Sequence, residues 1–95
     1  MEERHYLIQN ELEIIQNNEF FKFGTDSVLL ANFARLRTGA KVIDFGTGSG
    51  VIPLLLAYKQ NPSQVIGLEI QPELAELARR NVQLNNLNDL IKIKE

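Results

Sequence analysis

Three glycines and two carboxylates are the residues in this sequence whose types and spacing best suit chemistry. The glycines alternate with other residues at Gly46, Gly48 and Gly50. Asp44 stands two residues before the first of them, and Glu69 stands 19 residues after the last. Glycine adopts backbone conformations with positive φ, and because it has no Cβ atom a ligand can lie against its backbone. The pattern predicts a ligand-binding loop with an acid on either side.

The elements around this loop are two strands and a helix. Residues 41–45 form a short apolar strand that runs into the glycines, and residues 65–68 form a second strand that ends at Glu69. Residues 51–59 are apolar nearly all round, which is typical of a buried helix. The proline at the third position of this helix fits only a first turn, so the helix begins next to the glycines. Its first N–H groups have no partner within the helix and are available to a ligand.

The charge of these residues indicates the kind of ligand. A loop that binds a dinucleotide usually reads G-x-G-x-x-G, which places a pyrophosphate on the positive end of the helix. Here the third glycine comes one residue early, and Val51 stands where that loop has glycine. An acid at Asp44 suits a cation rather than a phosphate, and Glu69 is placed to accept hydrogen bonds from ribose hydroxyls. S-adenosylmethionine is cationic and has no phosphate, so we expect it rather than NAD.

The second part of the chain reads strand–helix–strand–helix–strand. Pro72 opens the second helix, with Arg79 and Arg80 expected near its other end, and residues 90–93 begin a third strand. Apolar strands that alternate with helices are typical of parallel pairing through right-handed crossovers. The fold class is therefore α/β, and these elements make up half of a doubly wound sheet.

The first part of the chain has a different pattern. It contains three short runs of strand-forming residues separated by asparagines, at 6–8, 12–16 and 20–23. Thr25 or Asp26 then caps a helix over residues 26–37, whose last turn contains Arg35 and Arg37. We expect a small antiparallel appendage followed by this helix.

Composition excludes several classes of protein. The chain has 95 residues, a net charge of −2, one histidine and no cysteine, so it has room for one domain and no set of zinc ligands. Its longest apolar stretch is eight residues, against about 20 for a membrane span, and its start lacks a secretory signal. No basic patch indicates a nucleic acid. We expect a cytoplasmic protein made of an appendage with a helix, residues 1–39, and the first half of a cofactor-binding domain, residues 40–95.

Three segments resemble the class I, Rossmann-like methyltransferases that use S-adenosylmethionine. Residues 42–50, Val-Ile-Asp-Phe-Gly-Thr-Gly-Ser-Gly, match motif I of that family, and residues 65–70 with Glu69 resemble its second motif. Residues 17–33, which include Phe-Gly-Thr-Asp-Ser-Val-Leu-Leu, are similar to the segment ahead of motif I in the small-domain methyltransferases. Within that group the sequence resembles the bacterial tRNA1(Val) (adenine-N6)-methyltransferase type.

The resemblance implies a larger, seven-stranded sheet whose first three strands lie in the order 3-2-1. It implies that the cofactor is S-adenosylmethionine, that Glu69 holds the ribose, and that Ile70 packs against the adenine. It also implies that the full protein acts on tRNA or another nucleic acid, with the exocyclic N6 amine of an adenine in tRNA as the expected target. The cofactor-binding residues expected in this sequence are Asp44, Gly46, Thr47, Gly48, Gly50, Glu69, Ile70, Thr25 and Asp26. We expect no catalytic residue and no metal ligand among the 95 residues.

One motif of the amine-methylating members is missing from the sequence. These members carry an Asn-Pro-Pro-aromatic motif after the fourth strand, where an amide and a carbonyl accept the hydrogens of the amine and a ring stacks on the base. The only related run, Asn61-Pro62-Ser63, precedes the second strand. We therefore expect an N-terminal portion or a truncated product that transfers no methyl group by itself. The first strand would have a free edge, which favours self-association.

Three other interpretations remain open from the sequence. The chain is a non-catalytic cofactor-binding module or a split subunit whose partner supplies the missing half. It is a fragment of a nucleotide-dependent oxidoreductase, in which case NADH would bind in place of S-adenosylhomocysteine. Or the glycines form a turn without a ligand, with Glu69 as a solvated strand end.

Overall fold

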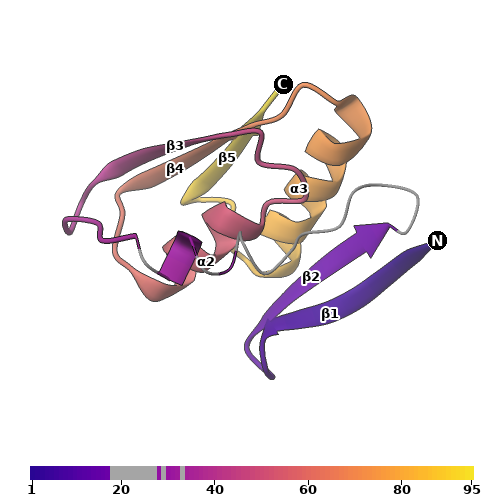
Figure 1. Ribbon diagram of the computed structural model, residues 1–95, viewed down its shortest axis with the longest axis horizontal. Coiled ribbons are helices and arrows are strands. Elements are labelled where there is room, and N and C mark those ends of the chain that lie inside the picture. Colours follow the sequence, from indigo (N-terminus) through magenta and orange to yellow (C-terminus); the bar gives the residue numbers. More distant parts are fainter. Residues whose placement is uncertain (18–27, 29, 33) are drawn as a thin grey trace.

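The computed structural model describes residues 1–17, 28, 30–32 and 34–95. A two-stranded antiparallel sheet and a three-stranded parallel sheet lie on opposite sides of two helices (Figure 1). The predicted α/β class is confirmed by this architecture. The expected strand at 20–23 and the expected cap at Thr25 or Asp26 lie outside the described residues.

The antiparallel sheet is a hairpin of β1 (Glu2–Ile8) and β2 (Leu12–Asn17). Both strands are longer than the sequence suggested, and Asn10 in the turn between them has a φ of 64°. Asparagine tolerates this left-handed conformation better than most residues. Leu12 and Ile14 are buried on one face of β2, so the hairpin contributes one side of the hydrophobic core.

The parallel sheet holds β3 (Lys41–Phe45), β4 (Gln64–Leu68) and β5 (Ile91–Lys94), with β4 in the centre. The strands are in register, so that Val42, Val65 and Ile91 lie side by side. Helix α2 (Val51–Lys59) joins β3 to β4, and helix α3 (Pro72–Leu84) joins β4 to β5. All three strands therefore end at the same edge of the sheet.

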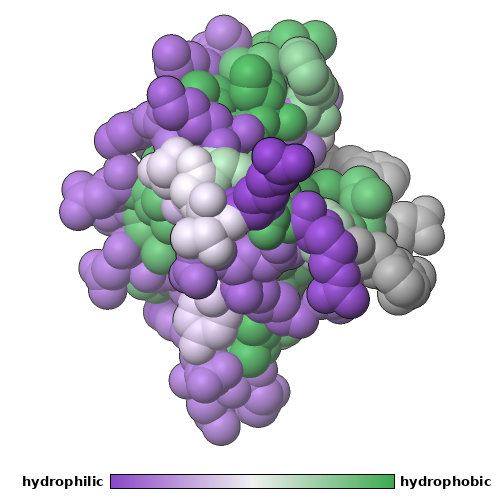
Figure 2. All heavy atoms as spheres, turned by 90° about the vertical axis from the view of Figure 1, so that its left-hand side faces the viewer, coloured by the Kyte–Doolittle hydropathy of each residue, from purple (hydrophilic) through white to green (hydrophobic). Residues whose placement is uncertain are grey.

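The core lies between the parallel sheet and the hairpin, and the helices fill it. Most of α2 is buried, as its apolar sequence predicted. It packs between the parallel sheet, at Val65 of β4, and the hairpin, at Ile14 of β2. On the other face of the sheet, Ile43 and Phe45 are 55% and 79% exposed. Figure 2 shows hydrophobic side chains reaching the surface in separate patches among hydrophilic ones.

The helix expected over residues 26–37 ends earlier than predicted. Residues 28 and 30–32 are helical, and the last helical bond runs from the Ala34 N–H to the Leu30 carbonyl. The following residues bind the Gln60 side chain instead, which accepts from the Leu36 N–H at 2.6 Å and donates to the Ala34 carbonyl at 2.7 Å. The assignment of Arg35 and Arg37 to the last helical turn was therefore wrong.

The predicted end of the helix that Pro72 opens also needs a correction. Helix α3 begins at Pro72 as expected but continues to Leu84, so Arg79 and Arg80 lie in its middle rather than near its end. Both arginines form ion pairs there, Arg79 with Glu95 and Arg80 with Glu2. Among the described residues, no helix is long and apolar enough to cross a membrane.

Candidate cofactor-binding site

The glycine loop connects the end of β3 to the start of α2. Gly46, Gly48 and Gly50 all have positive φ, at 66°, 56° and 94°, a region that L side chains rarely adopt. A Cβ atom at Gly46 or Gly48 would have no heavy atom within 4 Å. These two glycines therefore leave open space over the loop backbone, as a site that receives a ligand against its backbone requires.

Thr47 fastens the loop to the two strands beneath it. Its side chain is buried, its N–H donates to the Leu68 carbonyl at 2.9 Å, and its Oγ1 donates to Asp44 Oδ2 at 2.7 Å. The close fit depends on Gly67, because a Cβ atom there would lie 2.8 Å from Thr47 Oγ1. Gly67 is part of the site that sequence reasoning missed. A glycine inside a strand is the signal that could have found it.

Asp44 is a half-buried carboxylate under the loop. It lies opposite Gly67 in the register of β3 and β4. Burial raises the pKa of the Asp44 carboxyl above its usual range, and the hydrogen bond from Thr47 acts in the opposite direction. A ligand cation beside Asp44 would favour its charged form.

Glu69 binds the loop from the end of β4. It is only 6% exposed, its Oε1 accepts from the Gly48 N–H at 2.8 Å, and its Oε2 accepts from the Gln71 N–H at 3.1 Å. A carboxylate oxygen has two lone pairs and can accept more than one hydrogen bond, so each oxygen of Glu69 can accept a further bond from a ligand. Ile70, the next residue, is 88% exposed. An oriented carboxylate beside an exposed apolar side chain suits a ribose with an attached flat base.

The structure brings most of the predicted site residues to the end of the parallel sheet where its strands terminate. Asp44 and Glu69 bind consecutive residues of the loop, so the two acids lie on the same side of the fold. The residues placed at this end are Asp44, Gly46, Thr47, Gly48, Gly50, Glu69 and Ile70. Thr25 and Asp26 lie outside the described residues. The arrangement is able to hold a cationic nucleoside, since it combines two carboxylates with an open backbone loop.

Asn81 is a second residue of this region that sequence reasoning missed. It is fully buried in α3, and its Nδ2 donates to the Ser49 carbonyl in the loop at 2.9 Å. The signal was an asparagine on the apolar face of a helix, between Ala78 and Val82, both of which are buried. A buried amide is stabilised only where its hydrogen bonds are made, so such a position indicates a specific partner.

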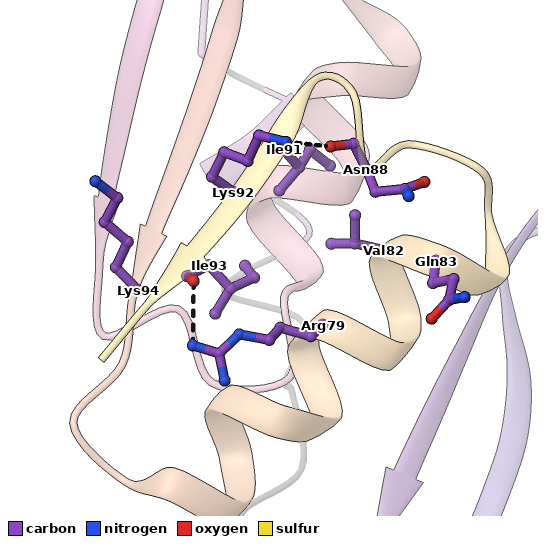
Figure 3. Close-up of a pocket in the computed structure, with 8 residues that line it drawn as sticks. All are labelled: Arg79, Val82, Gln83, Asn88, Ile91, Lys92, Ile93 and Lys94. Atoms are coloured by element: carbon purple, nitrogen blue, oxygen red, sulfur yellow. Dashed lines mark hydrogen bonds between the residues drawn. The ribbon is translucent and has the colours of Figure 1, made fainter.

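A pocket of about 420 Å³ lies away from the loop, between α3 and β5 (Figure 3). Val82, Ile91 and Ile93 contribute apolar surface to it. The Arg79 guanidinium donates to the Ile93 carbonyl at 3.3 Å, and the Lys92 ammonium donates to the Asn88 carbonyl at 2.8 Å. Its lining contains none of the predicted site residues. The first contact joins α3 to β5, and the second joins β5 to the turn that precedes it.

Comparison with known proteins decides the family. A family profile described as a methyltransferase domain matches residues 36–93, which include the loop and both acids. The chain belongs to this family. The predicted membership of the class I methyltransferases, a family of enzymes that use S-adenosylmethionine, is confirmed.

The curated relatives are longer proteins that match most of this chain. The chain is 37% identical over 75 residues to the tRNA1(Val) (adenine(37)-N6)-methyltransferase of Yersinia pestis (strain Pestoides F), and the match covers 78% of this chain and 30% of that protein. A similar protein of a Flavobacteriaceae bacterium (strain 3519-10) is 35% identical over 66 residues. The chain spans 29–30% of the length of these curated relatives.

Solved structures show the same fold. TYW2 of Pyrococcus horikoshii, solved in complex with MeSAdo, matches 97% of this chain and 34% of its own, with a TM-score of 0.76 and 21% identity. A putative S-adenosyl-L-methionine-dependent methyltransferase of Methanococcus maripaludis matches 74% of this chain and 31% of its own, with a TM-score of 0.62 and 28% identity. The first match includes nearly the whole chain, so the hairpin is part of the shared fold.

Proposed function

We propose that this chain forms the cofactor-binding part of a methyltransferase that transfers a methyl group from S-adenosylmethionine to the N6 amine of an adenine in tRNA. The observation that carries the proposal is the pairing of the two acids with one glycine loop, Asp44 through Thr47 and Glu69 through Gly48. The names of the curated relatives support the tRNA adenine as substrate. We also propose that the protein acts in the cytoplasm, because its proposed substrate is a tRNA.

The proposed roles follow from the chemistry of each group. Glu69 accepts hydrogen bonds from the ribose hydroxyls, using the lone pairs not occupied by the Gly48 and Gln71 N–H groups. Ile70 packs against the adenine. Asp44 favours the positively charged amino-acid end, directly or through water. The loop residues Gly46, Thr47, Gly48 and Gly50 line the cofactor with backbone. Thr25 and Asp26 are proposed to lie over the methionine end.

The proposed reaction is a direct displacement. S-adenosylmethionine supplies a methyl group activated by its sulfonium, and the chain's residues bind and orient that group in line with the amine. The adenine amine is a poor nucleophile and needs acceptors for its hydrogens, which the Asn-Pro-Pro-aromatic motif provides in amine-methylating enzymes. The 95 residues contain no such motif. We propose that residues 40–95 hold the methyl donor and that the chain alone transfers no methyl group.

An NMR titration of the 95-residue chain tests the cofactor assignment. S-adenosylhomocysteine should shift the amide signals of the glycine loop and of Glu69 and Ile70, and NADH should leave them unchanged. Because NMR detects millimolar affinity, even a weak site would be seen. Shifts caused by NADH alone would overturn the assignment and favour an oxidoreductase fragment.

We also propose that the chain self-associates through β3. In the described part of the chain β3 pairs only with β4, so its other edge carries unpaired backbone groups. Ile43 and Phe45 on that strand are the exposed apolar side chains that pairing would cover. Antiparallel pairing of two copies about Ile43 would place Lys41 of each copy opposite Phe45 of the other, where a cation–π contact is favourable. This contact would also serve a split subunit that recruits its second half.

A further inference from the structure

Two asparagines, Asn81 in helix α3 and Asn85 just after its last residue, bind the same strand of the hairpin. Asn81 Oδ1 accepts from the Ile15 N–H at 2.6 Å, and its Nδ2 donates to the Ile15 carbonyl at 3.0 Å. Asn85, one turn later, makes the same two bonds to Glu13, at 2.9 and 2.7 Å. Each amide thus satisfies both backbone groups of one residue, as a neighbouring strand would. The hairpin is therefore docked on α3 by two equivalent clamps.

The two clamps differ in their third hydrogen bond. The other bond of Asn85 stays within its own helix, to the Asn81 carbonyl at 2.8 Å. Asn81 instead donates to the Ser49 carbonyl at 2.9 Å, and Ser49 lies between Gly48 and Gly50 of the loop. Asn81 alone of the pair therefore connects the hairpin to the glycine loop.

This connection is closely packed. Asn81 is fully buried and Ser49 is 7% exposed, so water has little access to replace the bond between them. Beside it, a Cβ atom on Gly50 would lie 3.5 Å from the Cβ of Ala78, one turn before Asn81 on α3. Both Nδ2 hydrogens and Oδ1 of Asn81 are engaged, which fixes the orientation of its amide.

The geometry points to Asn81 as a positioning residue that sets the conformation of the glycine loop and couples it to the β1–β2 hairpin. This inference rests on the proposed function, because it takes the loop as the place where S-adenosylmethionine binds. Losing Asn81 would leave the Ser49 carbonyl without its partner and release the loop between Gly48 and Gly50. Losing Asn85 would weaken the hairpin contact and leave the loop as it is.

The test compares Asn81→Ala with Asn85→Ala. The second variant removes the equivalent pair of bonds to β2, made to Glu13 instead of Ile15. Affinity for S-adenosylhomocysteine is measured by NMR titration, and the unfolding midpoint by urea. We expect both variants to lose stability, Asn81→Ala to bind at least ten-fold more weakly, and Asn85→Ala to bind within two-fold of the wild type. Equal loss of affinity in the two variants would show that Asn81 has only a structural role and would overturn the inference.

A measurement on the wild type serves if Asn81→Ala does not fold. Native-state hydrogen exchange gives the opening free energy of each amide. We expect the Ile15, Gly48 and Gly50 amides to open together. A loop that opens while the Ile15 amide stays protected would contradict the coupling. A wild type that shows this joint opening but binds no S-adenosylhomocysteine would overturn the proposed function and leave the coupling in place.

Discussion

Each residue that holds the glycine loop has a second contact that ties it to the fold. Thr47 binds both Asp44 and the Leu68 carbonyl, and Glu69 binds both Gly48 and the Gln71 N–H. The spacing of the glycines and acids was sufficient to predict the loop and its acids. Gly67 and Asn81 lie outside that spacing; the sequence marks each as unusual for its position, but their contacts with the loop depend on how strands and helices pack.

Replacing Asp44 with asparagine should stabilise the protein at neutral pH. Burial raises the pKa of Asp44 in the folded state above 3.8, its value in the unfolded chain. Between the unfolded pKa and the raised folded pKa, the folded state therefore binds more protons than the unfolded state. The free energy of unfolding therefore falls as pH rises through that window, and the charged form is disfavoured above it. We expect Asp44→Asn to raise the free energy of unfolding at pH 7 and to give no gain below the unfolded pKa.

Urea unfolding of Asp44→Asn at neutral and acidic pH measures this gain. Asp89→Asn, which changes an exposed carboxyl, is the control and should match the wild type at both pH values. The same Asp44 variant should bind S-adenosylmethionine more weakly, because the neutral amide attracts a cation less. A loss of stability at neutral pH would contradict the account of Asp44.

Gly67→Ala tests the packing beneath the loop. The new methyl group would lie 2.8 Å from Thr47 Oγ1 and 3.0 Å from Ile93 Cδ1, so Thr47 would have to move away from Asp44. Forcing a methyl group into such a space typically costs about 1–3 kcal/mol. Urea unfolding gives the value, and a change below about 0.5 kcal/mol would mean that the strand accommodates a side chain here.

At the scale of elements, the sequence predicted the order and type of the parallel strands and their helices. Their apolar runs are buried by packing that any α/β sheet would provide, and Pro72 marks the start of α3 as expected. The ends of the helices were predicted less well. The early end near Ala34 depends on the Gln60 side chain, which is 26 residues away in sequence, and no local pattern contains that contact.

Docking of the hairpin on α3 is predicted to depend on Asn85 more than on Arg80. Asn85 binds both backbone groups of Glu13 in a partly buried site, whereas the ion pair of Arg80 with Glu2 is exposed. Leaving buried groups unpaired costs about 1–3 kcal/mol, whereas an exposed ion pair contributes little to stability.

Hydrogen exchange at the Glu13 and Ile15 amides is the measurement for the hairpin. Asn85→Ala should expose these amides substantially more than Arg80→Ala does. Asn88→Ala, which changes an exposed asparagine in the following loop, is the control and should leave them unaffected. Equal exposure in the Asn85 and Arg80 variants would show that the side-chain amide does not dock the hairpin.

At the scale of the whole molecule, the parallel sheet is covered by helices on one face, and its edge strand β3 exposes Ile43 and Phe45. Because the chain contains no cysteine, Ile43→Cys reports on pairing at this edge without background. Residues directly opposite each other on antiparallel strands have Cα atoms about 4.5–5.5 Å apart, which is within disulfide range. We expect mild oxidation of Ile43→Cys to give a covalent dimer.

Two variants distinguish specific pairing from collision. Glu73→Cys places an exposed thiol on α3 and should cross-link far more slowly. Phe45→Lys combined with Ile43→Cys should lose the dimer, since a charge would replace the aromatic side chain in the contact. Equal cross-linking of the two single-cysteine variants would contradict self-association through β3.

The most direct test of the central claim is the affinity of S-adenosylhomocysteine for the wild type and for Glu69→Ala, with Glu73→Ala as a control. Glu69 is the residue that both holds the loop and is proposed to bind the ribose, whereas Glu73 is exposed on α3. We expect saturable binding by the wild type and by Glu73→Ala, and a loss of at least ten-fold in Glu69→Ala. Binding that is unchanged in Glu69→Ala would contradict the assignment of this loop as the cofactor site.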